Sequence, residues 1–156
     1  MKIISPAFHN DKPIPVKYAY QGIVGGKNIS LPFQWSDIPE HTKSLALTII
    51  DPHPVAKHWV HWVVINIPAT ITELHEGASQ HKMPEVSVEL CNTYGEIGYG
   101  GPEPPKGSGI HPYVVTLYAL KVTMLSISDK VNAHDIHKAL EGKVISKATL
   151  TGTFEQ

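Results

Sequence analysis

Residues whose side chains could bind an anion or move a proton concentrate in three segments of the sequence, residues 51–54, 58–62 and 98–113. The first segment reads Asp-Pro-His-Pro, and its two prolines restrict the backbone and hold Asp51 and His53 in fixed directions. Histidines near a carboxylate can act as acid and base or as ligands. An Asp-Pro pair is also a common way to start a turn. This segment therefore indicates a functional site only in combination with the other two segments.

The second segment reads His-Trp-Val-His-Trp and lies in an apolar run, residues 57–67, that is predicted to be a strand. Successive side chains of a strand point to opposite faces, so Trp59 and His61 share one face while His58 points to the other. A His-x-x-His metal chelate of the helical kind is therefore excluded if the strand is regular. Considered alone, either histidine fits a hydrogen-bonded packing residue better than a ligand.

The third segment, residues 98–113, contains five glycines and three prolines before His111. Such a loop is stiff and exposes backbone N–H groups, which can hold an anion where they form a concave run. Lys106 precedes its glycine and a strand follows, which excludes a Walker A loop, and the glycine spacing excludes a dinucleotide fingerprint. A loop this long within a compact domain is more often functional than a passive connection. His111 and Tyr113, two residues apart in an extended segment, share a face.

The composition limits the ligands and partners of the chain. All thirteen basic residues are lysines, so no guanidinium is available to grip a phosphate or carboxylate. Such a ligand must be held by N–H groups, tyrosine, lysine or some of the ten histidines. The formal charge of −1 offers no basic surface for nucleic acid and no polybasic membrane anchor. Cys91 is the only cysteine, which excludes an intrachain disulfide.

The sequence contains no recognisable targeting or membrane-spanning segment. No apolar run approaches the ~18 residues that span a bilayer, and Met1–Pro6 lacks the apolar core of a secretory signal. We therefore expect a cytoplasmic protein. With 156 residues, no internal repeat and no linker, the chain is predicted to form a single domain, residues 1–156.

Short segments rich in Val, Ile, Thr and Tyr, separated by thirteen prolines and twelve glycines, predict a mainly β fold. Strong strands are expected at residues 44–50, 57–67 and 113–122, and weaker strands at residues 16–20, 86–90 and 148–154. One helix is expected after Asn132, which can act as its N-cap with Asp135 completing a weak capping box. Ile136, Ala139 and Leu140 follow at helical spacing and form its apolar stripe.

The order of these motifs resembles one protein family. An Asp-Pro loop, then Trp-x-His in a strand, then Gly-Tyr-x-Gly-Pro-x-Pro-Pro-x-Gly-x-Gly-x-His-x-Tyr is similar to the bacterial and archaeal branch of the phosphatidylethanolamine-binding protein family, also called Raf kinase inhibitor-like. Flanking segments agree, among them Ser5–Phe8, Asn28–Ser30 and the final Thr-Gly-Thr-Phe, so the resemblance covers nearly the whole chain. It implies a Greek-key antiparallel β-sandwich with one or two short helices, the main one near the C-terminus.

The resemblance also implies a function. Members of the family have a small preformed pocket that binds phosphate, acetate or a phospholipid headgroup, with no cofactor, no metal and no established catalytic role. We therefore expect a small-anion or phospho-group binding protein, not an enzyme, that regulates a protein partner such as a kinase or protease; a homodimer is compatible with the sequence. The residues that match the ligand-binding pocket of the family are Asp51, Trp59, His61, Glu103, Pro105, His111 and Tyr113.

Two positions depart from the family pattern. His53 stands where a second aspartate is usual, and Pro112 stands where an arginine is usual. Both charges of that pair are absent, so we expect the ligand preference at the outer rim of the pocket to differ. Because the chain has no arginine, the positive charge of the pocket would come chiefly from His61 and His111, and anion affinity is predicted to fall as pH rises.

A hydrolase that uses the same His and Asp side chains, with or without a metal, is the alternative function. Against it, the sequence has none of the common metal-ligand spacings and no Gly-x-Ser-x-Gly nucleophile elbow. Ser108 lies between two glycines, but this Gly-Ser-Gly triplet is shorter than that motif. A binding protein is therefore the favoured interpretation.

Overall fold

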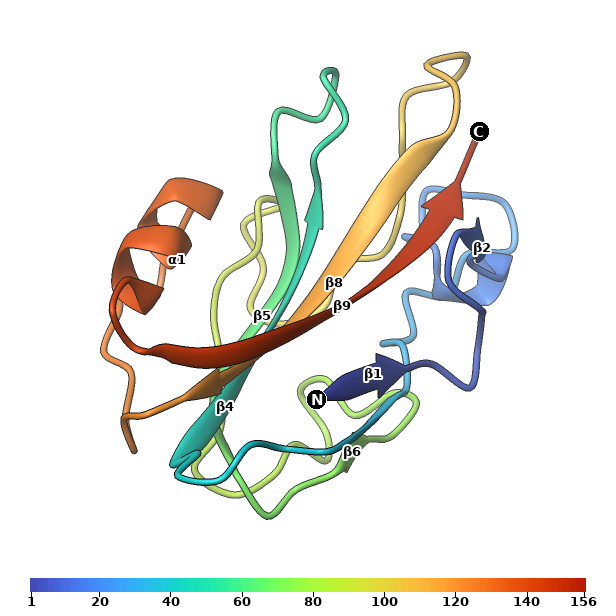
Figure 1. The fold of residues 1–156 in the computed structure, drawn as a ribbon. Coiled ribbons are helices and arrows are strands. Elements are labelled where there is room, and N and C mark those ends of the chain that lie inside the picture. Colours follow the sequence, from blue (N-terminus) through green and yellow to red (C-terminus); the bar gives the residue numbers. More distant parts are fainter.

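The computed structural model describes residues 1–156 as two β-sheets, one α-helix and one turn of 3-10 helix (Figure 1). In chain order the elements are β1 (Lys2–Ile4), β2 (Lys12–Pro13), the 3-10 helix η1 (Val16–Tyr18), β3 (Phe33–Ser36), β4 (Ser44–Asp51), β5 (Trp59–Pro68), β6 (Glu73–Leu74), β7 (Val88–Glu89), β8 (His111–Leu120), α1 (Ala133–Leu140) and β9 (Val144–Phe154). The small sheet has the order β1-β3-β6, and the large sheet has the order β2-β9-β8-β4-β5-β7. All pairs are antiparallel except β2 with β9.

The strand β4 lies in the interior of the large sheet and is buried along its whole length. Leu45, Leu47 and Ile49 point to one face and join a cluster of 20 buried residues that includes side chains of the small sheet. Ala46 and Ile50 point to the opposite face and join a cluster of 12 buried residues that includes side chains of α1. The large sheet is thus the middle layer, covered by the small sheet on one face and by α1 on the other (Figure 1).

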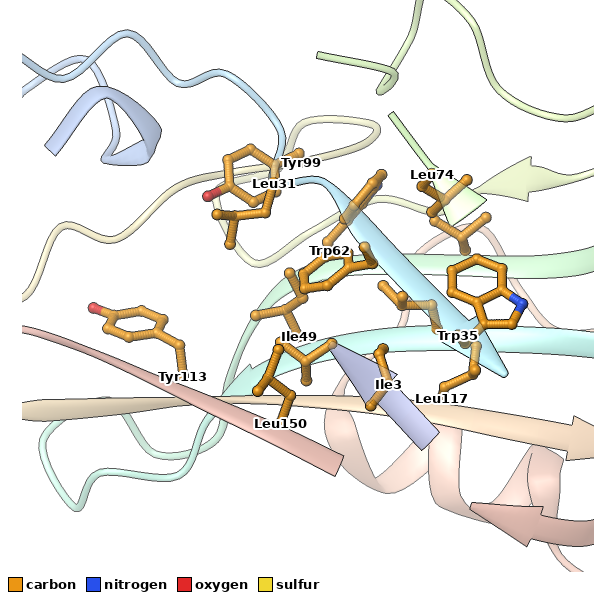
Figure 2. Close-up of a cluster of buried hydrophobic side chains, with 14 of the residues drawn as sticks. Ile3, Leu31, Trp35, Ile49, Trp62, Leu74, Tyr99, Tyr113, Leu117 and Leu150 are labelled. Atoms are coloured by element: carbon orange, nitrogen blue, oxygen red, sulfur yellow. The ribbon is translucent and has the colours of Figure 1, made fainter. Parts of the chain in front are cut away.

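The core between the two sheets combines aromatic and aliphatic side chains (Figure 2). The indole N–H of Trp62 donates to Glu89 Oε1 at 2.7 Å, and that of Trp35 donates to Ile71 O at 2.8 Å, so both buried donors are satisfied. Each fully buried aliphatic side chain of this core, such as Leu117, stabilises the fold by roughly 1.5–3 kcal/mol. The result is a rigid support beneath the strand ends that carry the candidate site.

The three strong strand predictions are confirmed as β4, β5 and β8, with ends shifted by one or two residues. The strand predicted at residues 148–154 is confirmed as part of β9, which begins earlier, at Val144. The strand predicted at residues 16–20 is wrong, because the chain after Pro15 turns into η1. In the segment 86–90 only Val88–Glu89 forms a strand, although the Leu90 N–H also donates to Val63 O of β5. Val86 adopts a positive φ of 61°, which interrupts extended structure.

The predicted helix is confirmed as α1. Asn132 is its N-cap and accepts the Asp135 N–H at 3.0 Å, while the Asp135 carboxylate accepts the Asn132 N–H at 3.4 Å, so the capping box is complete. Ile136 and Leu140 are buried against the large sheet, as the apolar stripe indicated. Neither helix is long and apolar enough to cross a membrane.

Candidate ligand-binding site

Three strand ends meet at one end of the large sheet. Because β4 is antiparallel to both β5 and β8, its last residues lie beside the first residues of the other two strands. Asp51 pairs with Trp59 across the β4–β5 ladder, and Ile50 pairs with Val114 across the β4–β8 ladder. This register brings together the three segments in which the sequence predicted site residues.

A cavity of about 360 Å³ opens at this end of the sheet, a size that suits a small ligand. All seven residues predicted from the sequence line it, namely Asp51, Trp59, His61, Glu103, Pro105, His111 and Tyr113. Five lining residues were not predicted, namely Val55, Ala56, Tyr94, Pro104 and Gln156. Pro104 lies within the segment 98–113, and Val55 and Ala56 directly follow the segment 51–54. Tyr94 and Gln156 come from segments with no pattern that could have indicated them.

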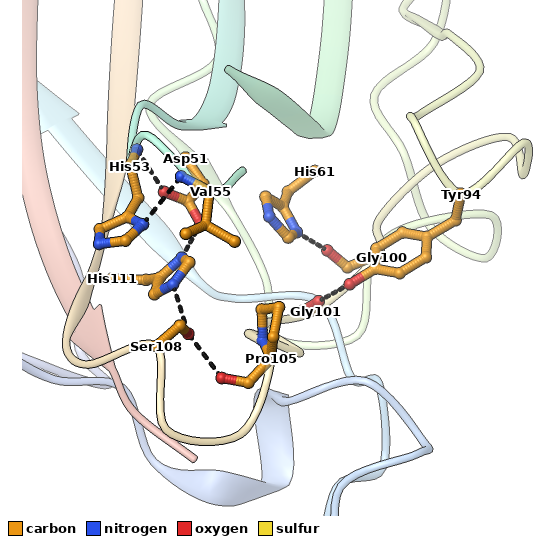
Figure 3. A network of polar contacts seen from close by, with 10 residues as sticks. All are labelled: Asp51, His53, Val55, His61, Tyr94, Gly100, Gly101, Pro105, Ser108 and His111. Carbon is orange, nitrogen blue, oxygen red and sulfur yellow. Dashed lines mark hydrogen bonds and ion pairs between the residues drawn. The ribbon is translucent and has the colours of Figure 1, made fainter. Parts of the chain in front are cut away.

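Asp51 and His111 form a buried pair in the wall of the cavity (Figure 3). His111 Nδ1 lies 2.6 Å from Asp51 Oδ2, and the two side chains are 1% and 3% exposed. The His53 N–H donates to Asp51 Oδ1 at 2.8 Å, and His111 Nε2 lies 2.9 Å from Ser108 Oγ. Both ring nitrogens of His111 are therefore engaged within the protein, and any positive charge on its ring is balanced by the adjacent carboxylate.

His61 is the second histidine of the wall, and its ring is neutral. Its Nδ1 donates to the carbonyl oxygen of Gly100 at 2.7 Å, so Nε2 carries the lone pair and has no partner within the protein. Burial lowers the pKa of His61 to about 4, although the Gly100 carbonyl and the Asp51 carboxylate act in the opposite direction. The prediction that His61 supplies positive charge near neutral pH is therefore wrong for the unliganded protein.

Two hydrogen-bond donors of the wall have no partner within the protein. Trp59 Nε1 is buried and unpaired. The Tyr113 hydroxyl also makes no hydrogen bond, although its side chain is only 1% exposed. Burial, reinforced by the negative charge of Asp51, raises the pKa of Tyr113, so its hydroxyl keeps its proton. Buried donors normally have an acceptor. Trp59 Nε1 is closed to solvent, whereas a ligand or water in the cavity can accept from the Tyr113 hydroxyl.

Tyr94 completes an aromatic frame around these groups. Its hydroxyl donates to Gly101 O at 2.9 Å (Figure 3). Its ring lies edge-on to the rings of Trp59 and His61, at centroid distances of 5.2 and 5.8 Å, and stacks flat on Tyr20 at 4.3 Å. Interlocked rings of this kind hold the cavity open without a ligand.

The glycine-proline loop does not form the open cradle of backbone amides that its sequence indicated. The N–H groups of Gly100, Gly101 and Gly107 donate to other parts of the protein at 2.7–3.0 Å, and that of Ser108 donates to a carbonyl within the loop. These bonds fix the loop over the cavity. The N–H groups of Gly109 and Ile110 have no acceptor within the protein, but neither residue lines the cavity, so a ligand there is held mainly by side chains.

The two departures from the family pattern have different consequences. The ring of His53 stacks on that of His111 with centroids 3.8 Å apart, so His53 is part of the wall around the buried pair. Pro112 lies in the β8–β9 ladder opposite Thr153, and it does not line the cavity. No lysine lines the cavity either, and Glu103 places a half-buried carboxylate in its wall.

The histidines do not gather into a metal site. No group of three or more His, Cys, Asp or Glu side chains is positioned to hold a metal ion. Of the two histidines that line the cavity, His111 has both ring nitrogens engaged and His61 has only Nε2 free. The donor set thus matches a small polar ligand better than a metal.

Comparisons with known proteins give a consistent result. The family model described as "Phosphatidylethanolamine-binding protein" matches residues 4–155. A UPF0098 protein of Methanothermobacter thermautotrophicus is 38% identical, over 100% of this chain and 99% of the relative. Among solved structures, YbcL of Escherichia coli, described as a member of the mammalian PEBP family, has a TM-score of 0.92 at 32% identity and covers 99% of this chain and 98% of its own. A putative phosphatidylethanolamine-binding protein homologue from Chlamydia trachomatis has a TM-score of 0.83 at 36% identity, over 99% of this chain and 97% of its own.

Proposed function

Since the chain belongs to the phosphatidylethanolamine-binding protein family, we propose that it is a binding protein whose cavity takes a small anion or phospho-group, such as phosphate, acetate or the phosphate of a phospholipid headgroup. The observation that carries this proposal is the unpartnered Tyr113 hydroxyl in the wall of the cavity, which the ring of Trp59 also lines. Anionic oxygens accept stronger hydrogen bonds than neutral acceptors do, so an anion satisfies the Tyr113 hydroxyl best.

The protonation of His61 narrows the chemistry of the ligand. Its Nε2 is an acceptor in the unliganded protein, and burial holds its pKa at about 4. A hydrogen phosphate can donate its P–OH to Nε2 while another of its oxygens accepts from the Tyr113 hydroxyl. A fully deprotonated anion would instead require His61 to take up a proton. The site therefore favours an anion that carries one proton or gains one on binding.

The proposal extends to a protein partner. A phosphate or carboxylate can belong to a larger molecule, including a regulatory segment of a kinase or protease, and still place the same group in the cavity. Val55 of the cavity wall is 53% exposed, and Ile110, beside His111, is 61% exposed. Exposed apolar side chains next to a polar cavity provide contact area for such a partner.

The three tryptophans provide a direct test of ligand binding. In the 1H–15N NMR spectrum, titration with inorganic phosphate is expected to move the indole resonance of Trp59, because its side chain lines the cavity. The indole N–H groups of Trp35 and Trp62 already donate to Ile71 O and Glu89 Oε1, so their resonances serve as internal controls. Acetate and a short-chain phospholipid are titrated in the same way to compare the sources of the anionic group.

Two results would count against the proposal. One is an indole resonance of Trp59 that stays fixed in phosphate, acetate and phospholipid alike. The other is a uniform movement of all three indole resonances, which would indicate a general salt effect. A saturable shift of Trp59 alone supports the cavity as the binding site.

A further inference from the structure

A chain of hydrogen-bonding side chains leads from the cavity wall to the surface. Ser108 Oγ lies 2.9 Å from His111 Nε2, and His111 Nδ1 lies 2.6 Å from Asp51 Oδ2 (Figure 3). A hydroxyl within reach of an imidazole, whose other nitrogen is held by a buried carboxylate, is the arrangement that activates serine nucleophiles. His111 and Asp51 are 0% and 2% exposed, whereas Ser108 is only half-buried. The base is thus fixed in place while the hydroxyl remains accessible.

The surrounding bonds set the direction of the protons. Asp51 accepts the His53 N–H on Oδ1, which leaves Oδ2 to accept the Nδ1–H of His111. In the neutral ring, Nε2 of His111 is then the unprotonated nitrogen, and it faces the hydroxyl of Ser108. The Pro105 carbonyl, 2.5 Å from Ser108 Oγ, is the second acceptor for the same hydroxyl proton. The hydroxyl has one proton and two acceptors, and it is activated when the proton points to His111.

A second serine shows that the turn alone does not require the histidine. The N–H and hydroxyl of Ser87 donate to Pro84 O at 3.2 and 2.5 Å. The N–H and hydroxyl of Ser108 donate to Pro105 O at 3.1 and 2.5 Å. The two turns are therefore alike, but no histidine ring nitrogen lies within hydrogen-bond reach of the Ser87 hydroxyl. The contact with His111 is an addition specific to Ser108.

The backbone around Ser108 suits a reaction at its hydroxyl. Gly107 and Gly109 on either side have φ of 75° and 87°, a conformation that glycine adopts without strain and that turns the chain sharply about the serine. The N–H groups of Gly109 and Ile110 donate to no group of the protein. The N–H of the residue after a serine nucleophile is a common donor to the oxyanion that forms during acyl transfer.

We propose that Ser108 is a nucleophile for small activated carboxylic esters, with His111 as its general base and Asp51 as the residue that positions the base. Ser108 Oγ attacks the carbonyl carbon while its proton passes to His111 Nε2. The bond to the alcohol oxygen breaks, and the alcohol leaves with that proton. Water then attacks the acyl-serine, His111 takes a proton from the water and returns it to Ser108 Oγ, and the carboxylic acid is released.

The cavity lies beside Ser108 and can hold the acyl group of an ester. His111 and Pro105 line the cavity and also contact Ser108, so the acyl group can lie against the wall of the cavity while the hydroxyl attacks. At about 360 Å³ the cavity admits short acyl chains or a single aromatic ring. The proposal goes beyond anion binding, and either activity can exist without the other.

Covalent labelling of the purified protein with a fluorophosphonate, followed by intact mass and peptide mapping, tests the nucleophile. Displacement of fluoride by Ser108 Oγ is expected to leave one phosphonyl group on Ser108. Ser108→Ala is expected to abolish the labelling and to lower p-nitrophenyl acetate hydrolysis by on the order of 10²-fold. Ser87→Ala, which removes the hydroxyl from the matched turn, is expected to change neither.

The role of Asp51 is tested by the labelling rate of two Asp51 variants. In Asp51→Asn the side chain no longer holds His111 in the tautomer whose Nε2 faces the Ser108 hydroxyl, so labelling of Ser108 is expected to slow by on the order of 10²-fold. Asp51→Glu, which keeps a carboxylate, is expected to recover part of that rate. A labelling rate in Asp51→Asn equal to that of the unaltered protein overturns the role of Asp51. If this variant does not fold, the comparison of the two serine variants decides the proposal.

The outcomes separate this activity from anion binding. Labelling that is absent, that maps to another residue, or that survives Ser108→Ala overturns the proposal. The phosphate-induced shift of the Trp59 indole resonance is expected to persist in Ser108→Ala, since Ser108 does not line the cavity. A negative labelling result thus leaves the binding function intact, and a missing indole shift leaves the nucleophile intact.

Discussion

Asp51 Oδ2 and His111 Nδ1 lie 2.6 Å apart in the wall of the cavity, and 3% or less of either side chain is exposed. A carboxylate this deeply buried requires hydrogen-bond partners. Asp51 has two, the backbone N–H of His53 and the ring of His111. The pair therefore stabilises the fold as well as shaping the site. The pattern of the sequence indicated that both residues face the pocket, but not that they satisfy each other.

The Asp51–His111 contact predicts a large loss of stability in His111→Ala. The substitution leaves the Asp51 carboxylate without its side-chain partner, and removing one member of such a pair typically costs about 3–5 kcal/mol. His53→Ala is the control, because it removes the stacked ring but keeps the N–H bond to Asp51 Oδ1. Urea unfolding measures the free energy of unfolding of each variant. Equal decreases in His111→Ala and His53→Ala would contradict a special role for the Asp51–His111 pair.

Tyr113→Phe is expected to weaken anion binding while leaving the unfolding midpoint almost unchanged. The substitution keeps the buried ring and removes only a hydroxyl that has no partner within the protein. Losing one hydrogen bond to a charged ligand would cost roughly 1.5–3 kcal/mol of binding free energy. Calorimetric titration with phosphate measures the effect. Tyr118→Phe is the control, since Tyr118 is buried on the same strand but does not line the cavity.

The alternation of side chains along a strand was enough to predict four of the twelve residues that line the cavity. It placed Trp59 with His61 and His111 with Tyr113, and each pair does line the cavity. That these pairs face one another depends on the register of β4 with β5 and β8, which no local pattern of the sequence encodes. The contribution of Tyr94 depends on the same long-range packing.

Protonation was the property that the sequence predicted least well. Histidine composition indicated positive charge at His61, but full burial and a bond from Nδ1 to a carbonyl make its ring neutral. Likewise, the glycines of the loop indicated free amides, whereas Gly100 and Gly101 use theirs to fasten the loop to the rest of the protein. Both outcomes depend on burial and on partners far away in the sequence.

Gly101→Ala is expected to destabilise the protein and to disturb the cavity. An added Cβ would lie 2.1 Å from the Tyr18 carbonyl oxygen, so the loop would have to move, at a cost of roughly 1–3 kcal/mol. The movement would also displace the carbonyl that accepts the Tyr94 hydroxyl. In Gly107→Ala the Cβ meets nothing within 4 Å, and only the positive φ of 75° costs about 1 kcal/mol. Thermal unfolding and phosphate affinity should change together in the first variant, and phosphate affinity should not change in the second.

Acid is expected to destabilise the protein through His61. Its pKa is about 4 in the folded protein and ~6.5 when unfolded, so between these values the unfolded chain binds more protons than the folded one. The stabilising contribution is complete above about pH 6.5 and is lost as pH falls towards 4, by roughly 3 kcal/mol in all. Urea unfolding across this range should show a smaller pH dependence in His61→Gln. The exposed His81 provides the control variant His81→Gln, whose pH dependence should match that of the unaltered protein.

Anion affinity is expected to fall as pH rises, because binding couples to proton uptake at His61. A bound anion favours the imidazolium and raises the pKa of His61 above its free value of about 4. Affinity is therefore highest below that value, declines by up to about tenfold per pH unit as pH rises, and becomes constant above the raised pKa of the complex.

Dimethyl phosphate is a suitable probe because it remains a monoanion throughout and brings no proton of its own. NMR titrations between about pH 5 and pH 8, following the His61 ring protons, would measure both the affinity and the protonation. His61→Gln should bind the probe with the same affinity at every pH. A flat profile in the unaltered protein would instead mean that the Tyr113 hydroxyl holds the anion while His61 stays neutral.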